Sequence, residues 1–297
     1  MSQTVTPALR QWIVEQTAAG FPPESVLAAM VTAGWEAGLA EVALEDTLRD
    51  YLRTHSKAGA VVAPVPVVRE PRPTVVVPAS GVPDIALGQS PNRVDAGDRE
   101  VAILLSMVSP RVVILGGLLS PEECDALVAA ARPRMARSLT VETKSGGEEL
   151  NESRTSEGMF FGRGESDLLR TIEARIARLL NWPVEFGEGM QVLHYGVGAE
   201  YRPHYDYFDP AEPGTPTILK RGGQRVGTLV MYLNEPELGG GTTFPDVGLE
   251  VAPQRGNAVF FSYDKPHPST KSLHGGAPVV AGEKWVATKW LRQGVFE

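Results

Sequence analysis

The stretch that decides the fold spans residues 190–206 and reads MQVLHYGVGAEYRPHYD. Its first six residues are largely apolar or aromatic and end at a glycine, which predicts a short strand. His204 and Asp206 stand at positions i and i+2 near the end of the stretch. Side chains on a strand alternate between its two faces, so this imidazole and this carboxylate point the same way. Such an arrangement suits two neighbouring ligands of one metal ion.

Other short apolar segments follow the same pattern downstream, at 226–233, 249–251, 257–262 and 285–291. Many short strands without long helices between them predict a sandwich or jelly roll. Helices are expected upstream. Ser120-Pro-Glu-Glu123 forms a capping box with proline at the first helical position, and residues 167–180 give a second helix. Cys124 lies in the first of these helices and is expected to be a buried structural thiol.

The chain divides into three parts by composition. Residues 1–56 hold three short amphipathic stretches and are predicted to form a helical accessory bundle. Residues 57–97 are predicted to be a semi-rigid linker, because 57–92 holds seven prolines and many valines. Residues 98–297 are predicted to form the catalytic domain. The expected fold class is therefore mainly β with flanking helices, preceded by a small helical module.

Composition excludes several classes of protein. The 297 residues carry a formal net charge of −8 and are 42% hydrophobic, which is enough for a core. A pI of about 5.3 argues against nucleic-acid binding, which needs a basic surface. No apolar run approaches the roughly 20 residues that cross a bilayer, and no secretory signal is visible, so no membrane partner is expected. A single cysteine suits a reducing compartment, and we expect a cytoplasmic protein.

His274 is the candidate for a third metal ligand, 68 residues beyond Asp206 and just before another predicted strand. Two histidines and one carboxylate make the facial triad of non-haem iron(II), which leaves coordination positions open. A His-x-Asp pair alone also fits a strand histidine paired with a nearby aspartate. Lys284 adds a second signal, because a cation in an apolar cavity can pair with the distal carboxylate of a dicarboxylate co-substrate. Taken alone, Lys284 also fits a surface lysine.

Together these motifs resemble the catalytic domain of prolyl 4-hydroxylases, over roughly residues 110–293. The matching segments are Gln191–Tyr195, His204–Asp206, Gln224–Val226, Gly239–Pro245, Ser272–His274, Lys284–Trp285 and, upstream, Arg154–Ser156 with Gly158. The resemblance implies a double-stranded β-helix domain that hydroxylates a prolyl residue of a protein or peptide at its 4-position. It also implies iron(II), 2-oxoglutarate and O2, the release of succinate and CO2, and ascorbate as the reductant.

The resemblance implies a role for each matching position of the metal and co-substrate site. The iron ligands would be His204, Asp206 and His274. Lys284 would bind the C5 carboxylate of 2-oxoglutarate, assisted by the hydroxyls of Tyr195 and Thr242.

Further matching positions concern the peptide substrate. Glu188 and Arg225 would flank it, Arg154 and Ser156 would belong to a mobile loop that covers it, and Tyr201 would lie beside the target ring. The sequence departs from the family at Ala277, where many relatives have cysteine, and at Gly241, where many have glutamate. Neither departure removes a metal ligand.

Other functions remain open at this level. The same chemistry could act on a lysyl residue, a free amino acid or a small molecule. The domain could also be a non-catalytic jelly-roll binding module that keeps the ligands. A zinc hydrolase would use two histidines and an aspartate, but it gives Lys284 no role. The N-terminal helices are expected to recruit a partner or the substrate.

Overall fold

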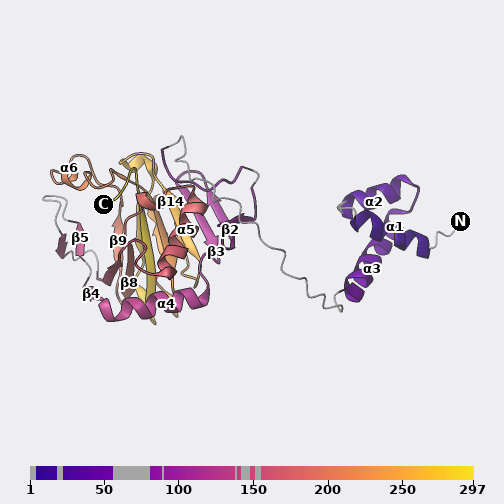
Figure 1. Ribbon diagram of the computed structural model, residues 1–297, viewed down its shortest axis with the longest axis horizontal. Coiled ribbons are helices and arrows are strands. Elements are labelled where there is room, and N and C mark those ends of the chain that lie inside the picture. The colour runs from indigo at the N-terminus through magenta and orange to yellow at the C-terminus, as the bar shows by residue number, and fades with distance from the viewer. Residues whose placement is uncertain are drawn as a thin grey trace. The chain divides into compact units, whose positions relative to one another are not determined.

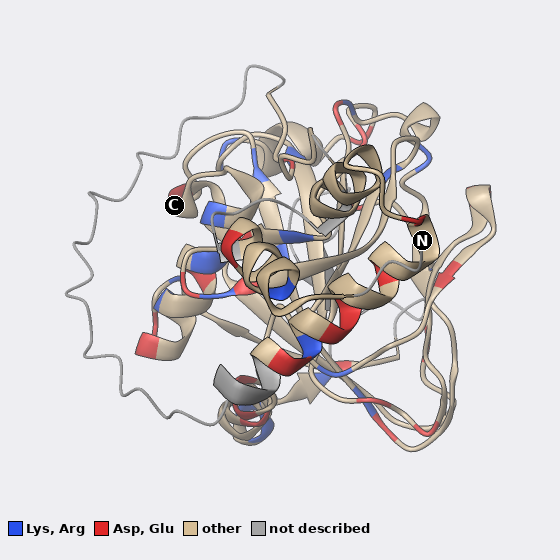
Figure 2. Ribbon diagram, turned by 90° about the vertical axis from the view of Figure 1, so that its right-hand side faces the viewer, with Lys and Arg blue, Asp and Glu red and all other residues tan. Residues whose placement is uncertain are grey.

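The computed structural model describes residues 5–18, 23–55, 81–88, 90–137, 139–141, 148–150 and 155–297. The chain forms two compact units, Met1–Arg72 and Pro73–Glu297 (Figure 1). Basic and acidic residues are interspersed along the helices and loops rather than gathered in long blocks (Figure 2). Within the part of the chain that is described, no helix combines the length and the apolar character that a bilayer span requires.

The N-terminal unit consists of α1 (Pro7–Ala18), α2 (Pro23–Thr32) and α3 (Ala37–His55). Each helix is amphipathic, and the apolar sides meet in one small core. Val26 and Met30 share a face of α2 because residues four apart lie one above the other on a helix. The buried members of this core are Ile13, Val26, Met30, Ala40, Ala43 and Leu44.

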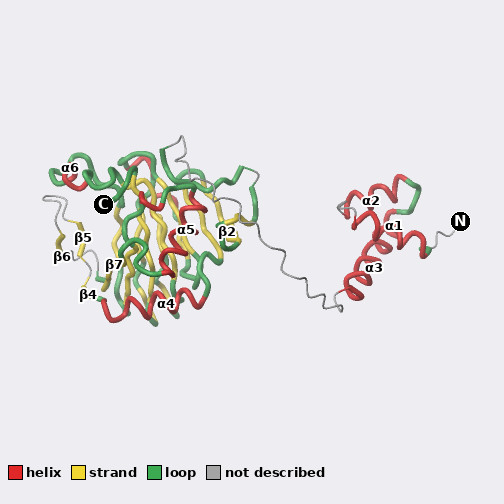
Figure 3. The backbone as a smooth tube through the Cα atoms, viewed as in Figure 1, coloured by secondary structure: helices red, strands yellow, loops and turns green. Residues whose placement is uncertain are grey.

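The second unit is built on two main β-sheets, as Figure 3 shows. The larger, antiparallel sheet has the strand order β1 (Arg93–Asp95), β2 (Glu100–Met107), β3 (Arg111–Gly116), β14 (Ala258–Ser262), β10 (Arg225–Tyr232), β17 (Lys284–Arg292), β8 (Met190–Tyr195), β7 (Glu157–Phe161) and β4 (Ala136–Arg137). The smaller sheet has the order β13 (Leu249–Val251), β12 (Thr242–Phe244), β15 (His274–Gly276) and β9 (Tyr201–His204). Two short pairs complete the strands, β11 (Leu238–Gly239) with β16 (Val279–Ala281) and β5 (Leu139–Val141) with β6 (Glu148–Leu150).

From β8 onward the chain passes repeatedly between the two main sheets: β8, β10, β14 and β17 belong to the larger sheet, and β9, β12, β13 and β15 to the smaller. This alternation is the jelly roll, or double-stranded β-helix, that the short strands and the family resemblance predict. The expected mainly β fold with flanking helices is confirmed.

Alternation along the strands produces two separate cores. In β10, Leu229 and Met231 belong to the core that the larger sheet shares with the helices α4 (Pro121–Ala131) and α5 (Asp167–Leu180). Tyr232 faces the other way and joins the core between the two sheets, together with Phe244 of the smaller sheet. Both layers are largely apolar, which is why a strand such as β14 reads as a nearly continuous apolar run, whereas β17 also buries Lys284, Thr288, Lys289 and Arg292.

The predicted features of the two flanking helices are present. Ser120 Oγ accepts a hydrogen bond from the Glu123 amide at 3.2 Å, and the Glu123 carboxylate accepts one from the Ser120 amide at 2.8 Å. Cys124 is fully buried in α4, and burial raises the pKa of its thiol. A further short helix, α6, covers Thr215–Ile218.

Part of the segment expected to be linker packs on the larger sheet instead. Ile85 is buried, and the Asp84 carboxylate pairs with Arg111 at 2.7 Å. Residues 93–95 form β1, an edge strand paired with β2. The apolar side chains between the prolines explain this packing, since they cover the rim of the core. Residues 57–80 and 89 of that segment lie outside the described residues.

Candidate functional site

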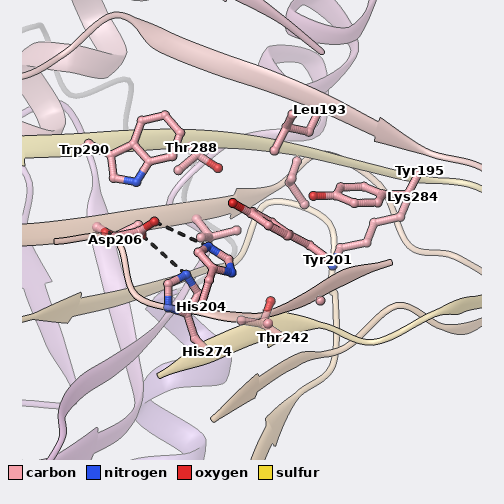
Figure 4. A pocket seen from close by; sticks show the side chains of 15 residues that line it. Leu193, Tyr195, Tyr201, His204, Asp206, Thr242, His274, Lys284, Thr288 and Trp290 are labelled. Atoms are coloured by element: carbon pink, nitrogen blue, oxygen red, sulfur yellow. Dashed lines mark hydrogen bonds and ion pairs between the residues drawn. The ribbon is translucent and has the colours of Figure 1, made fainter. Parts of the chain in front are cut away.

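Backbone pairing in the smaller sheet brings the three candidate metal ligands together. His204 ends β9, His274 begins β15, and the two residues lie directly opposite each other in the antiparallel register. Asp206 follows two residues after His204 and turns toward both imidazoles (Figure 4). Its carboxylate oxygens lie 3.5 Å from His204 Nε2 and 3.4 Å from His274 Nε2. The three ligand atoms lie within 4.8 Å of one another, close enough to hold one ion.

Hydrogen bonds to the backbone orient both imidazoles. Nδ1 of His204 lies 3.0 Å from the Arg202 carbonyl, and Nδ1 of His274 lies 3.0 Å from the Ser272 carbonyl. A carbonyl oxygen only accepts, so each Nδ1 carries the proton. The Nε2 atoms then present lone pairs toward the shared point, which is the tautomer that a metal ligand requires. Burial lowers the pKa of His274 to about 4, so its imidazole is neutral at pH 7.

A buried chain of hydroxyls holds the carboxylate of Asp206. Thr228 Oγ1 donates to Asp206 Oδ2 at 2.7 Å and lies 3.0 Å from the Tyr263 hydroxyl. Burial alone would raise the pKa of Asp206, but the neighbouring His274 and His204 outweigh it and hold the pKa well below its usual range. Asp206 is therefore an ionised ligand at neutral pH. Two imidazole nitrogens and one carboxylate on one side of an ion form the donor set of a non-haem iron(II) site.

Lys284 closes the opposite end of the same pocket. It begins β17 opposite Tyr195 of β8, and its Nζ lies 5.4 Å from the Tyr195 ring centroid and 6.0 Å from that of Tyr232. Only 4% of the residue is exposed, and no carboxylate of the described residues lies within ion-pair distance of its ammonium. Burial lowers the pKa of Lys284 to about 8. Thr242 Oγ1 accepts a hydrogen bond from the Tyr232 hydroxyl at 2.8 Å beside it.

These features fit an iron ion and a dicarboxylate co-substrate. A buried ammonium without a counter-ion is costly and calls for an anion. A second unsatisfied donor lines the pocket, because Trp290 Nε1 is buried without a hydrogen-bond partner among the described residues. The remaining lining is largely apolar, from Leu193, Val230 and Val286. The pocket thus offers a metal-binding cluster at one place and a cation at another.

The residues matched to the substrate fall into three groups. Tyr201 lines the pocket and stacks on His204, with ring centroids 3.7 Å apart. Glu188 and Arg225 form a bidentate ion pair at 2.6 and 2.9 Å, next to the pocket rather than in it. Ser156 is buried but does not line the pocket, and Arg154 lies outside the described residues. The expected mobile loop around 144–158 is likewise largely outside them.

Sequence reasoning missed several residues of this site. Thr228, Tyr232 and Thr288 contribute hydroxyls to the pocket or to its buried support. Thr288 stands four residues from Lys284 on β17, so the alternation along that strand was the available signal for it. No such signal existed for Thr228 and Tyr232, because the sequence had indicated no position of β10 that lines the pocket. Gly241 also finds an explanation, because a Cβ there would lie 2.2 Å from the carboxylate of Glu250. The neighbouring strand already fills that space.

Comparisons with known proteins place this site in a family. Residues 190–292 match the family model described as the 2OG-Fe(II) oxygenase superfamily. Prolyl 4-hydroxylase 5 of Arabidopsis thaliana is 40% identical over 222 residues, which are 68% of this chain and 74% of the relative. Prolyl 4-hydroxylase 1 of the same plant is 43% identical over 202 residues, 62% of this chain and 70% of the relative.

A solved structure, the 2-oxoglutarate complex of a viral collagen prolyl hydroxylase from Paramecium Bursaria Chlorella virus-1, is 32% identical, with a TM-score of 0.46. The match covers 61% of this chain and 95% of the chain of the viral enzyme. Fold and site define an iron(II)- and 2-oxoglutarate-dependent oxygenase. Within that class, the identity to the plant enzymes shows that the chain belongs to the prolyl 4-hydroxylase family.

Proposed function

We propose that this chain hydroxylates a prolyl residue of a protein or peptide at the 4-position, with iron(II), 2-oxoglutarate and O2. The observation that carries the proposal is the shared pocket of the His204–Asp206–His274 cluster and the unpaired ammonium of Lys284. A zinc hydrolase would need the cluster but not the ammonium. Membership of the prolyl 4-hydroxylase family supports the prolyl target over a lysyl residue or a small molecule.

Residues in different parts of the pocket would have different roles. His204, Asp206 and His274 would hold the iron on one side and leave coordination positions open. Bound iron and 2-oxoglutarate supply the oxidising chemistry, in which one atom of O2 enters the substrate C–H bond and the other enters succinate, with loss of CO2. Lys284 would hold the distal carboxylate of 2-oxoglutarate by a charge-assisted contact, with the Thr242 and Tyr195 hydroxyls beside it.

The walls of the pocket would protect and orient the reacting groups. Trp290 and Tyr201 exclude water from opposite sides of the metal cluster and leave the target ring an apolar surface to contact. Exclusion of water strengthens every charge interaction inside the pocket. The Thr228 and Tyr263 hydroxyls keep the Asp206 carboxylate turned toward the imidazoles.

A direct assay tests this function. The purified protein is incubated with Fe(II), 2-oxoglutarate, ascorbate as the proposed reductant, and a proline-containing peptide. The expected product is the peptide heavier by about 16 Da, the mass of one oxygen atom, at the prolyl residue, with one succinate formed per hydroxylation. Matched peptides with alanine or lysine in place of proline should stay unmodified. Succinate release with iron bound but no oxidised peptide would point to another substrate, and no succinate at all would favour a binding module.

We also propose that the N-terminal helices recruit the substrate or a partner. The support is their separate core, which makes residues 1–72 a compact unit. Deleting residues 1–56 should slow turnover of the native protein substrate and leave turnover of a short peptide unchanged. Equal rates on the native substrate with and without these residues would contradict this role.

A further inference from the structure

One face of β17 extends beyond the iron pocket. Lys284, Val286, Thr288 and Trp290 line the pocket and stand at every second position of the strand. Arg292 is the next residue in this row, because the side-chain period of a strand is two. It lines a second cavity of about 710 Å³. The row of side chains that forms one wall of the iron pocket therefore continues into the wall of the second cavity.

A β-bulge brings another arginine into the same row. On β10 the register with β17 shifts between Arg225 and Gly227, so that Arg225 pairs with Arg292. Without the extra residue Arg225 would fall one position further along and face the other side of the sheet. Its guanidinium instead lies 4.0 Å from the ring centroid of Trp290. Trp290 thus separates the iron pocket from Arg225.

The second cavity is rich in guanidinium groups, which come from Arg163, Arg221, Arg225 and Arg292. Glu188 is the ion-pair partner of both Arg225 and Arg292, each at 2.6 Å. Arg163 donates to three backbone carbonyls, and Arg221 donates to the Glu297 carbonyl while stacking on Phe296.

Within the described residues, no carboxylate lies within 4.0 Å of the Arg163 guanidinium, whereas Arg221 Nε lies 2.6 Å from a main-chain oxygen of Glu297, which belongs to the terminal carboxylate of this chain. Four positive side chains face three carboxylate groups along this cavity, the side chains of Glu188 and Glu297 and the main-chain carboxylate of Glu297. This excess of positive charge stands out in a chain whose formal net charge is −8. Both Arg163 and Arg221 are exposed, so an incoming anion can reach them.

Two apolar aromatic rings, of Trp290 and Phe160, lie between the two cavities. Phe160 lines the second cavity, is 48% exposed, and lies 6.4 Å from the Trp290 ring between centroids. An extended peptide advances about 3.3 Å per residue, so a few residues carry it from the metal cluster past Trp290 and Phe160. A main chain that runs in this direction would cross these two apolar rings and then meet the arginines.

We propose that this arginine-lined cavity binds an acidic side chain, Asp or Glu, of the substrate within about five residues of the target proline. The inference rests on the proposed prolyl hydroxylation and adds a charge class to its substrate. Arg221 is the residue that contacts the acid, because its guanidinium is exposed and, among the described residues, only its Nε is hydrogen-bonded, to a main-chain oxygen of Glu297, which leaves both Nη groups to the substrate. Arg225 and Arg292 remain paired with Glu188, and together these three residues contribute a net positive charge to the electrostatic potential beside Arg221.

Synthetic peptides test the proposal. Each is a neutral peptide with one proline and one variable residue, which is Asp, Asn or Lys at each of five positions on either side. Hydroxylation is followed by mass spectrometry and kcat/KM is compared between the peptides. At the favoured position Asp should exceed Asn by roughly threefold to tenfold, the range of one partly exposed charge pair, and Lys should fall below Asn. High salt should reduce the advantage of Asp.

Variants identify the arginine responsible. Arg221→Gln should bring the Asp to Asn ratio close to one, and Arg221→Glu should reverse the preference so that the Lys peptide is favoured. A higher kcat/KM for the Lys peptide than for the Asp peptide cannot result from misfolding of the variant, which would lower both values. Lys220→Gln is the matched control, because it removes the same charge from the neighbouring residue, which lines neither cavity, and it should keep the ratio.

Equal kcat/KM for Asp and Asn at every position overturns the inference while prolyl hydroxylation stands. The same conclusion follows if the Asp advantage persists in both Arg221 variants. Failure to hydroxylate any of the peptides overturns the proposed function, and the inference falls with it.

Discussion

Replacing Lys284 by methionine removes the positive charge at the inner end of the iron pocket and keeps a side chain of similar length. The residue is 4% exposed, so a bound carboxylate would lose its partner in a site that water cannot easily enter. Removing one partner of a buried, hydrogen-bonded charge pair costs about 2–5 kcal/mol. At about 1.4 kcal/mol per tenfold, a loss of about 3 kcal/mol weakens 2-oxoglutarate binding roughly 150-fold.

The measurement is calorimetric titration of 2-oxoglutarate into the Fe(II)-loaded protein without O2, for the parent chain and for Lys284→Met. 2-Oxobutanoate is the matched control ligand, since it carries the chelating keto acid but no C5 carboxylate. Its weaker affinity should be the same for both proteins, and Lys284→Arg should recover part of the loss for 2-oxoglutarate. A Lys284→Met protein that binds 2-oxoglutarate within fivefold of the parent would refute this reasoning. So would an equal loss for both keto acids.

Four further outcomes are expected. Because burial lowers the pKa of Lys284 to about 8, its ammonium is lost as pH rises, so the KM for 2-oxoglutarate should be flat below pH 7 and rise about tenfold per unit above pH 8. Thr228→Val removes the hydroxyl that donates to Asp206 and should weaken iron binding roughly 10- to 100-fold in a chelator competition, with Tyr263→Phe a milder case. Dialysis against EDTA should abolish succinate formation, Fe(II) should restore it, and recovery with Zn(II) would contradict an oxygenase. Glu188→Gln leaves two buried guanidinium groups without a carboxylate and should lower the free energy of unfolding by about 3–5 kcal/mol in urea titration, whereas an unchanged midpoint would mean that the ion pairs do not stabilise the fold.

Most of the metal cluster could be predicted from the sequence, because two of its three ligands are close together in the chain. His204 and Asp206 stand two residues apart, and although β9 ends at His204, the Asp206 carboxylate just beyond it lies on the same side as both imidazoles, as the period of a strand predicts. His274 is harder, because its position depends on the register between β15 and β9. The match of several ordered motifs supplied that information, whereas spacing alone could not. Tyr201 and Thr242 entered through the same match, and both line the pocket.

Features that depend on an irregular backbone or on distant packing were not predicted. The bulge that turns Arg225 toward Trp290 is one inserted residue, and Gly227 beside it was the one local signal of the shift. Arg292 ends a strand and reads as a solvent-facing residue, although it is buried against Glu188. The strands before residue 117 were also missed. In β2 the exposed and buried positions do not alternate regularly, so the pattern lacks the period of a strand.

Strand β17 holds one charged residue of each pocket at its two ends. Its nine residues hold Lys284, the proposed anchor of the co-substrate, at one end and Arg292, which lines the second cavity, at the other, and at about 3.4 Å per residue those two positions stand roughly 27 Å apart. Stiff central strands of this kind let one end be rebuilt while the other keeps its shape. New target proteins could thus be acquired by exchanging residues around Arg292 and Arg221, with no retuning of the oxidant end.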